Sequence, residues 1–487
     1  MVRPSPSADA GASSSVGGEK SIEAAGKATR APAIASYQLA LRYLDSHMNL
    51  ERVRVDRANR SVFTLERMLA LLAALDNPHR DVRCVHVAGS KGKGSTVEMT
   101  AACLGECGYA VGVYTSPHLV HIRERIRLNA DPISHARFTQ GMARVAQAAV
   151  AIEPECGKPT YFELLTALAL LHFADQAVDI AVIETGLGGR LDSTNVIQPE
   201  VTAITAIQLE HTEMLGTTLE EIAAEKAGIF KPGVAALTVP QTPEVEAVLR
   251  DKAEAVGTRL EMLGREIEFS YRFEASPELG PHARVSLTTE RSEYEHLPVP
   301  LKGEHQAHNC GLALAILDRL RDRGYETPER AVLLGLATTP ANGRMEIAFD
   351  DPRIIIDGAH NPESIKALVK AIGAHMKYDS MVVIFGCAED KDVDGMLRML
   401  ALGADKVLFT RSSENPRAID PKELQRRFAE ISPKMTQVVP KLKEAINTAH
   451  KAIGRDDLIC VTGSFYLAGE AKKMLQDAKA KADKARR

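Results

Sequence analysis

The sequence contains no tryptophan, and aromatic residues of all kinds make up only 5% of its 487 residues. Proteins that bind single-stranded nucleic acids stack the bases on aromatic side chains, so such a platform is not expected here. Excess positive charge is also missing, because 60 basic residues stand against 64 acidic ones. Dedicated nucleic-acid-binding proteins are basic overall, and this balance therefore argues against that class while leaving room for a local basic site.

Cysteine pairs and long apolar runs are lacking as well. The seven cysteines are odd in number and never spaced as C-x-x-C, which argues against a disulfide framework and against a zinc ribbon. No apolar run reaches the roughly 18 residues of a transmembrane span, and the N-terminus has no apolar signal core. We therefore expect a protein of the reducing cytoplasm that does not enter a membrane.

The chain has enough apolar residues, at 45%, to form hydrophobic cores, and its 25% of charged residues is typical of folded proteins. At roughly 150 residues per domain, the length predicts about three domains or two large ones. Residues 1–33 consist mainly of Ala, Ser, Gly and Pro and predict a disordered tail, since they cannot bury enough apolar area to offset the entropy of ordering. Residues 476–487 are rich in Lys and Ala and predict a frayed, solvated tail.

Between these tails, short apolar segments alternate with segments of helical periodicity. The strand-like segments are almost entirely apolar, which is typical of parallel strands covered by helices on both faces. In the first half they are residues 84–90, 109–116, 178–185 and 200–207, with helices at 95–108 and 162–176. The alternation predicts an α/β fold built on a parallel sheet.

The pattern changes at residues 255–300, where apolar and polar residues alternate and turn residues are frequent. This change predicts antiparallel strands that decorate the first domain. Helical periodicity returns at residues 306–322, and the first domain is predicted to cover residues 34–340.

A second α/β series follows, with strands expected at residues 353–360, 380–388, 405–411 and 457–464. Pro340, Asn342 and Gly343 cluster just before it and mark a domain boundary. We therefore predict a second, smaller α/β domain over residues 345–475.

Residues 89–96, Gly-Ser-Lys-Gly-Lys-Gly-Ser-Thr, lie between a predicted strand and a predicted helix. At such a junction, backbone N–H groups of the helix start face an anion, and the helix dipole adds to the attraction. Glycine permits positive φ and close approach of phosphate, while Lys93 would reach the β and γ phosphates and Ser95 would bind Mg²⁺. The predicted nucleotide-binding residues of this loop are Gly89, Gly92, Lys93, Gly94, Ser95 and Thr96.

The strict Walker pattern is not met, because Gly94 separates Lys93 from Ser95 and Val87 occupies the position of the first glycine. The variant resembles the loop of the Mur ligase superfamily of ATP-dependent amide ligases. Within it, the chain resembles the folylpolyglutamate synthase/dihydrofolate synthase family in motifs that run in order from about residue 36 to 470: AGSKGKGST, TSPHLVHIRERIRLN, TYFE, IETGLGGRLDSTN, HTEMLG, EKAGIFKPG, GEHQAHN, NGR, DGAHNP and NPRA. The resemblance implies a P-loop parallel-sheet ATPase domain, a smaller Rossmann-like C-terminal domain, and a monomer.

Three further residues are candidates for a metal site. Glu184 ends an apolar strand, at the edge where open α/β sheets bind ligands. His211 follows another strand, while Lys226 in a predicted helix would by itself indicate a solvated charge. The resemblance implies that Ser95, Glu184 and His211 bind Mg²⁺ at two sites, and that Lys226 is carbamoylated by CO₂ into an anionic ligand. A requirement for K⁺ is left open.

The resemblance also implies nucleotide contacts from the middle and second half of the chain. Gln306 and Asn309 open a predicted helix, where their amides would bind the adenine edge or simply cap the helix. Arg344 lies at the interdomain boundary and would reach phosphate when the domains close. Asp357 and His360, in DGAHNP, follow a predicted strand and would lie near the ribose and the γ-phosphate.

A basic loop at residues 115–129 would suit an anionic acceptor, although the charges alone are equally typical of a solvated surface. The resemblance places the folate against this loop and against TYFE, and the implied folate-binding residues are Ser116, Pro117, His118, Arg123, Phe162 and Glu163. Glutamate carries two carboxylates, so a cationic fork is expected for it. Arg417 is the candidate, with Ser412 and Ser413 nearby.

The implied reaction adds L-glutamate to a folate, and in some members to dihydropteroate, as ATP becomes ADP and phosphate. A carboxylate is a poor acyl donor, so ATP would convert it into an acyl phosphate, which the glutamate amine attacks. Lys93, Lys226 and His360 are the expected catalytic residues. The alternatives are a Mur-type ligase acting on a UDP-sugar peptide and a P-loop NTPase without ligase activity.

Overall fold

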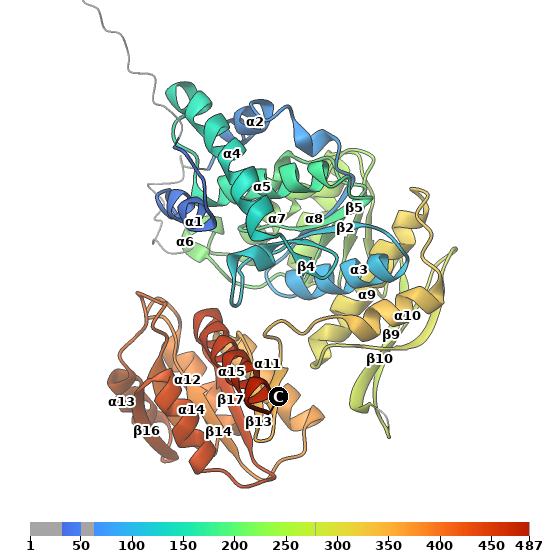
Figure 1. Ribbon diagram of the computed structural model, residues 1–487. Helices are drawn as coiled ribbons and strands as arrows, with labels where there is room; N and C mark the ends of the chain where they lie inside the picture. Colours follow the sequence, from blue (N-terminus) through green and yellow to red (C-terminus); the bar gives the residue numbers. More distant parts are fainter. Residues whose placement is uncertain (1–31, 50–62, 278, 487) are drawn as a thin grey trace, which may run out of the picture.

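The computed structural model describes residues 32–49, 63–277 and 279–486, so the predicted tail of residues 1–33 lies outside the described residues except at its end. The described strands form an eight-stranded, a three-stranded and a six-stranded sheet. Two lobes result, with the blue-to-yellow part of the chain, through α10, in one and the orange-to-red part, from β12 onward, in the other (Figure 1).

The eight-stranded sheet has the order β4-β3-β2-β5-β1-β6-β7-β8. Its strands from β2 to β8 in that order pair in parallel, whereas β3 and β4 add antiparallel pairs at one edge. The predicted parallel sheet is therefore confirmed. The strands are β1 (Cys84–Ala88), β2 (Val111–Tyr114), β3 (Ile126–Leu128), β4 (Asp131–Pro132), β5 (Ile180–Glu184), β6 (Val201–Ile204), β7 (Ala235–Thr238) and β8 (Leu260–Met262).

Helices cover both faces of this sheet, as expected for buried parallel strands. Val85 and Val87 of β1 pack toward α3 and α9, while Cys84 packs in a second cluster with α2, α4 and α5. The helices of the two faces are α1 (Tyr37–Asp45), α2 (Leu65–Ala73), α3 (Lys93–Glu106), α4 (His135–Cys156), α5 (Tyr161–Asp175), α9 (Glu304–Arg321) and α10 (Glu329–Thr338). A third cluster joins β6 and β7 to α6 (Thr212–Leu215), α7 (Leu219–Lys226) and α8 (Pro243–Ala255).

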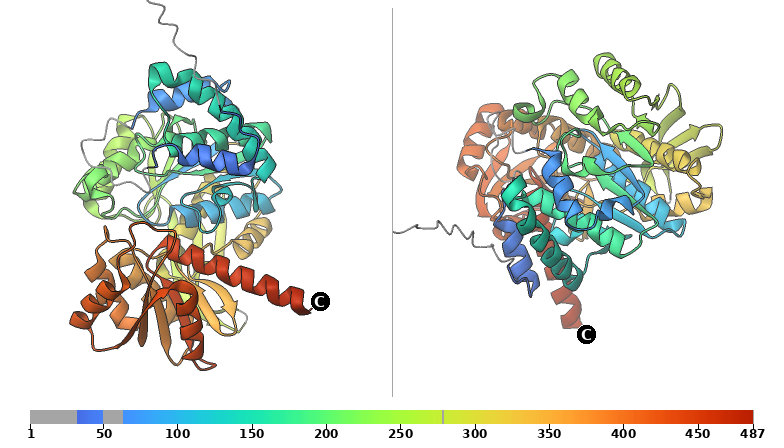
Figure 2. Two further views of the ribbon diagram at one scale, coloured as in Figure 1. Left: turned by 60° about the vertical axis from the view of Figure 1, so that its left-hand side comes forward. Right: turned by 90° about the horizontal axis from the view of Figure 1, so that it is seen from above.

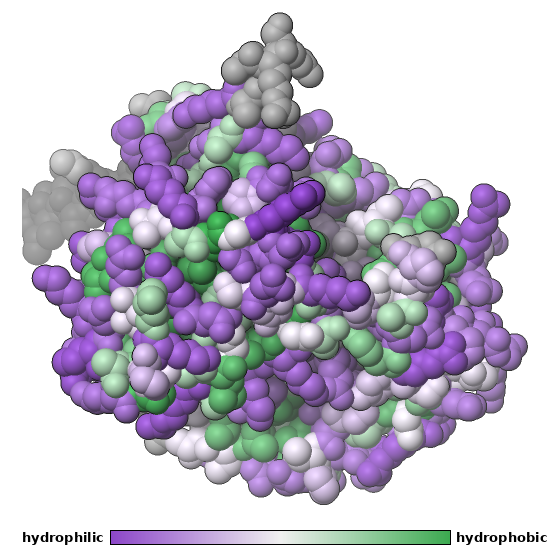
Figure 3. Space-filling model, turned by 90° about the horizontal axis from the view of Figure 1, so that it is seen from below, coloured by the Kyte–Doolittle hydropathy of each residue, from purple (hydrophilic) through white to green (hydrophobic). Residues whose placement is uncertain are grey.

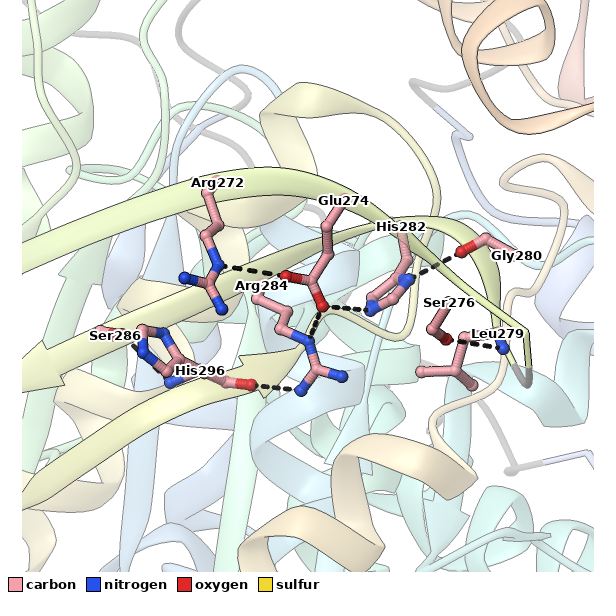
Figure 4. A network of polar contacts seen from close by, with 9 residues as sticks. All are labelled: Arg272, Glu274, Ser276, Leu279, Gly280, His282, Arg284, Ser286 and His296. Carbon is pink, nitrogen blue, oxygen red and sulfur yellow. Dashed lines mark hydrogen bonds and ion pairs between the residues drawn. The ribbon is translucent and has the colours of Figure 1, made fainter.

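The three-stranded sheet, of β9 (Glu268–Ser276), β10 (Gly280–Thr288) and β11 (Glu293–Pro298), is antiparallel as predicted. The start of the same turn-rich stretch behaves differently, because β8 pairs in parallel with β7 and extends the large sheet. Glu274 of β9 accepts hydrogen bonds from Arg272 of the same strand and from Arg284 of β10, and it lies 3.5 Å from Nε2 of His282 of β10 (Figure 4). The pairs of Glu274 with Arg284 and His282 join the two strands and stabilise the sheet.

The six-stranded sheet has the order β12-β13-β17-β14-β15-β16, with β12 antiparallel and the other pairs parallel. The four predicted strands are present, and the two that the sequence did not reveal, β12 and β16, are partly exposed edge strands. Its strands are β12 (Glu346–Asp350), β13 (Arg353–Ile356), β14 (Met381–Phe385), β15 (Lys406–Arg411), β16 (Met435–Lys441) and β17 (Leu458–Thr462). Its helices are α11 (Pro362–His375), α12 (Val393–Gly403), α13 (Pro421–Ile431), α14 (Leu442–Lys451) and α15 (Phe465–Arg486).

The last helix leaves the second lobe as a long rod (Figure 2), and the predicted frayed tail is helical through Arg486. Hydrophilic residues dominate the face of the molecule seen in Figure 3, with hydrophobic residues scattered among them. Within the described ranges, no helix combines the length and the apolar character that crossing a bilayer would need.

Candidate functional site

The glycine-rich loop connects β1 to α3, as the sequence predicts. Gly89 and Gly92 have φ values of +141° and +100°, which residues with a side chain rarely adopt. A Cβ on Gly89 would lie 1.9 Å from Oγ1 of Thr205, and one on Gly92 would lie 2.2 Å from Oδ1 of Asn309. Both positions therefore require glycine, because conformation and space forbid any larger residue.

The first turn of α3 buries Ser95 and Thr96 and directs Lys93 back across the loop, where its Nζ donates to the carbonyl of Gly89 at 2.9 Å. A Cβ on Gly94 would meet Nη2 of Arg344 at 2.1 Å and Oε2 of Glu184 at 3.4 Å. Arg344 from the interdomain boundary and Glu184 from the end of β5 therefore both lie next to the start of α3.

Glu184 is 5% exposed at the carboxyl end of β5, where its Oε2 accepts the N–H of Ser116 at 3.2 Å. Burial raises the pKa of Glu184, and the charges of Lys93 and Arg344 oppose this rise. Ser116, near the start of the predicted acceptor loop, is therefore hydrogen-bonded to a residue on the nucleotide side of the molecule.

Lys226 ends α7 and is fully buried, so the sequence default of a solvated lysine is wrong. Its Nζ donates to the carbonyl of Gly89 at 2.8 Å and to Oε1 of Glu210 at 2.9 Å. Burial lowers the pKa of Lys226 to about 8. For Glu210, burial acts to raise the pKa, but the neighbouring cations, led by Lys226, hold it at about 2.

His211 lies next to Glu210, at the start of α6 and in the left-handed conformation with φ of 46°. Burial lowers its pKa to about 4, so the ring is neutral near pH 7 and able to act as a ligand. Sequence reasoning named His211 and missed Glu210, although the two adjacent residues follow the same strand.

Gln306 and Asn309 are both buried in the first turns of α9. They do not cap the helix, because Gly303 is the N-cap residue and Nδ2 of Asn309 donates to Oε1 of Gln306 at 3.0 Å. Since Asn309 lies directly against Gly92, this amide pair borders the phosphate loop.

The second lobe contributes Asp357 and His360 after β13. The carboxylate of Asp357 accepts the N–H groups of Met345 and Ala359, each at 2.8 Å, and burial raises its pKa to about 6. His360 has Nε2 3.4 Å from Nζ of Lys91 in the glycine-rich loop, and burial lowers its pKa to about 3. The two lobes therefore meet at the predicted phosphate site.

A cavity of about 600 Å³ lies beside this meeting point. Of the predicted site residues, its wall contains Phe162, Glu163, His211, His360 and Arg417. Polar residues that the sequence did not reveal also line it, among them Arg67, Lys91, Glu210, Asp390 and Lys391.

The missed residues differ in the signal that they carried. Lys91 lies inside the glycine-rich loop, and Asp390 and Lys391 follow β14 at the carboxyl end of the sheet, where ligands are expected. Arg67 carried no signal, because it resembles any charged residue of a surface helix. In the structure it is 9% exposed, and its Nε donates to both carboxylate oxygens of Glu163, at 3.0 and 2.9 Å.

Several residues that are predicted to bind substrate are hydrogen-bonded to other residues of the protein. Nη1 of Arg123 donates to the carbonyl of Ile133 at 3.0 Å, and Nδ1 of His118 accepts from Nε of Arg125 at 2.9 Å. The hydroxyl groups of Ser412 and Ser413 donate to the carboxylate of Glu470, each at 2.9 Å. The residues that line the cavity do not include Pro117, and they also do not include His118, Arg123, Ser412 or Ser413.

Two family models match the chain, "Mur ligase middle domain" over residues 87–317 and "Mur ligase, glutamate ligase domain" over residues 343–465. The dihydrofolate synthase/folylpolyglutamate synthase of Bacillus subtilis is 35% identical over 415 residues, which are 85% of this chain and 95% of the relative.

Solved structures give the same result. Mycobacterium tuberculosis folylpolyglutamate synthase complexed with ADP and AMPPCP aligns with a TM-score of 0.81 and 31% identity, over 91% of this chain and 98% of the other. Escherichia coli FolC in complex with DHPP and ADP aligns with a TM-score of 0.77 and 29% identity, over 92% of this chain and 100% of the other.

Proposed function

Because this chain belongs to the folylpolyglutamate synthase/dihydrofolate synthase family of the Mur ligase superfamily, we propose that it joins L-glutamate to the carboxyl group of a folate as ATP is converted to ADP and phosphate. One observation in the structure supports the proposal independently of the family. Lys91 of the phosphate loop and His360 of the second lobe lie 3.4 Å apart at the wall of one cavity, so ATP and both ligation substrates can meet there.

The acceptor is activated by phosphoryl transfer, for which the protein supplies positive charges and positions the reacting groups. Lys93 and Lys91 neutralise the phosphates as the γ-phosphoryl group passes to the folate carboxylate, with loss of ADP. Both lysines already lie at the loop, and the Arg344 guanidinium lies at the start of α3. Because these charges are held before substrate binds, little reorganisation is needed during the transfer.

The second step is attack of the glutamate amine on the acyl phosphate. The C–N bond forms through a tetrahedral anion, the C–O bond to phosphate breaks, and the departing phosphate takes the amine proton. Acyl phosphates hydrolyse readily, so the site must exclude water. The cavity lies between two lobes, and their closure on the substrates supplies that exclusion.

The residues present fit Mg²⁺ that arrives with the nucleotide. No group of three or more His, Cys, Asp or Glu side chains that could hold a metal occurs in the part of the chain that the structure describes. A nucleotide-bound Mg²⁺ needs only one or two protein carboxylates, because phosphate and water supply its other oxygens. We propose that Ser95, Glu184 and His211 hold it, and when bound it neutralises the charge on the transferred phosphoryl group.

A carbamate on Lys226 is part of the proposal. The buried amine lies between Gly89 and Glu210, where a desolvated lysine can lose its proton and react with CO₂. The resulting anion would repel Glu210, so the ion pair of the unmodified chain must open first. A monomeric state, a cytoplasmic location and any need for K⁺ stay predictions.

The deciding experiment measures ADP release with dihydropteroate and then with tetrahydrofolate, each with and without L-glutamate. We expect release that depends on glutamate and on at least one of the two acceptors. Equal release without any acceptor would favour the NTPase alternative, and release only with a UDP-sugar peptide would favour a cell-wall ligase.

A further inference from the structure

The loop at residues 115–129, which is predicted to bind the acceptor and is called the acceptor loop below, contacts both lobes of the molecule. At one end, Ser116 donates its N–H to Glu184 on the nucleotide side. In the middle, the side chain of Leu119 packs against the hydrophobic core of the second lobe. A loop predicted to cover the folate therefore depends on the second lobe for part of its packing.

The contact with α15 is unusually close. A Cβ on Gly469 would lie 1.7 Å from the carbonyl oxygen of Leu119, so the helix and the loop touch backbone to backbone. A Cβ on Gly343, at the interdomain linker, would lie 3.1 Å from Cδ2 of the same leucine. Leu119 thus sits between the linker and α15, and both positions lack a side chain at the contact.

The loop is stiffened so that this contact can be transmitted. The carboxylate of Glu124 accepts the N–H groups of three consecutive residues, Leu119, Val120 and His121, at 2.8 to 3.2 Å. A turn held by one carboxylate moves as a unit, so displacing Leu119 displaces its neighbours as well.

The same helix, α15, also contacts residues of the second lobe that are predicted to bind glutamate or nucleotide. Its residue Glu470, next to Gly469, binds Ser412 and Ser413, and the ring of Phe465 lies 5.7 Å from that of His360. Lys472 pairs with Glu346 of β12. One helix thus fixes elements of the second lobe and the loop of the first.

We infer that Leu119 and Gly469 are positioning residues: docking of the acceptor loop on α15 through this contact sets the loop for acceptor binding. The inference rests on the proposed function for its kinetic part, because that function identifies the loop with the folate. The docking itself is independent of any reaction.

The test compares two glycine-to-alanine substitutions within helices. Gly469→Ala places a methyl group against Leu119, whereas Gly373→Ala in α11 adds one where no atom lies within 4 Å. Both gain helix propensity, so only the clash distinguishes them. Hydrogen exchange at residues 115–125 should be faster in Gly469→Ala than in the wild type and unchanged in Gly373→Ala.

Kinetics give the second readout. For Gly469→Ala, kcat/KM for the acceptor should fall on the order of tenfold while KM for ATP stays within about twofold, since misplacement by roughly 1 Å is enough for such losses. Unchanged exchange, unchanged acceptor kinetics, or equal changes in Gly373→Ala would overturn the inference.

A second pair covers the case in which Gly469→Ala does not fold. Leu119→Ala and Ile446→Ala each remove a partly buried side chain from the same core of the second lobe, but only Leu119 belongs to the loop. Similar losses in Tm with an acceptor effect confined to Leu119→Ala support the inference, and equal kinetics contradict it. If no folate stimulates the wild-type enzyme, the proposed function fails, while the exchange comparison still decides the docking.

Discussion

The two walls of the interdomain cavity hold their charges in different ways. On the first wall, Glu210 pairs with the buried Lys226, and their side chains are 13% and 1% exposed. On the second wall, the side chains of Arg417, Asp390 and Lys391 are 28%, 24% and 32% exposed in their pairs. Buried charges cannot lose a partner cheaply, whereas solvent-screened pairs can open for an incoming ion. The charges of the first wall are therefore held in place before substrate binds. The ion pairs of the second wall can open, so that its cations become able to bind the carboxylates of an amino acid.

The largest loss is expected from Lys93→Ala. Removing the ammonium group that is predicted to face the phosphates should reduce folate-dependent ADP release at least about hundredfold, with the fold intact. Lys252→Ala, which removes the same charge from the exposed face of α8, is the matched control. Normal ADP release by Lys93→Ala would contradict the assignment of the phosphate loop.

Glu210→Gln tests the buried pair of the first wall directly. It leaves Lys226 without its anionic partner and should lower the free energy of unfolding by about 3 kcal/mol. The comparison is Glu225→Gln, which opens a pair with Arg190 whose side chains are 28% and 56% exposed and should cost at most about 1 kcal/mol. Denaturant unfolding of both variants measures this difference, and equal losses would show that burial does not distinguish the pairs.

Lys226→Ala separates a ligand from a structural cation. If the carbamate forms, activity should fall by roughly 10- to 100-fold, as for losses around metal ligands, and acetate should restore part of it by replacing the missing carboxylate. Lys252→Ala again serves as the control and should not respond to acetate. Activity of Lys226→Ala near that of the wild type, unaltered by acetate, would count against the carbamate.

What the sequence could predict depends on whether a feature is formed by residues that are close together in the chain. The phosphate loop is contiguous, and its glycines, lysines and flanking strand and helix follow from local rules, so Gly89, Gly92 and Lys93 lie as predicted. The parallel sheets were equally readable, since buried parallel strands are almost purely apolar. Edge strands such as β16 escaped because half-exposed strands lack that signal.

Partners across the chain were not readable. Nothing local indicates that Arg67 is buried against Glu163, or that Glu470 accepts the hydroxyl groups of Ser412 and Ser413. Such pairs depend on the packing of helices far apart in the sequence. Motifs that are contiguous in the sequence can therefore be located without the structure, whereas the partners of their side chains cannot.

Arg417→Ala probes the exposed wall. Nη1 of Arg417 lies 3.2 Å from Asp390 at the cavity, and loss of one charge-assisted contact should raise KM for glutamate about tenfold while the stability changes little. Ser413→Ala should have a smaller effect on this KM, since its hydroxyl group is engaged with Glu470. A larger effect from Ser413→Ala than from Arg417→Ala would move the glutamate site toward the serine loop.

The smallest effect concerns His375, which joins the three-stranded sheet to α11 and so helps to keep the two walls opposed. Its Nδ1 donates to the carbonyl of Pro281 at 2.8 Å, and its Nε2 accepts the N–H of Gly303 at 3.1 Å, so the ring must be neutral. Burial lowers the pKa of His375 below its usual 6.5, and the charges of Lys302 and His282 lower it further. Below pH 6.5 the unfolded chain takes up a proton that the fold excludes, so this contribution to stability is complete above that pH and is lost as the pH falls.

Replacing His375 with Gln removes the titrating group from this contact. Between pH 7 and pH 5, the free energy of unfolding should therefore fall less in His375→Gln than in the wild type, by about 1 kcal/mol. His450→Gln, at an exposed position of α14, should follow the wild type. Urea unfolding at the two pH values measures the difference, and identical pH dependence in His375→Gln and the wild type would mean that this contact does not sense protonation.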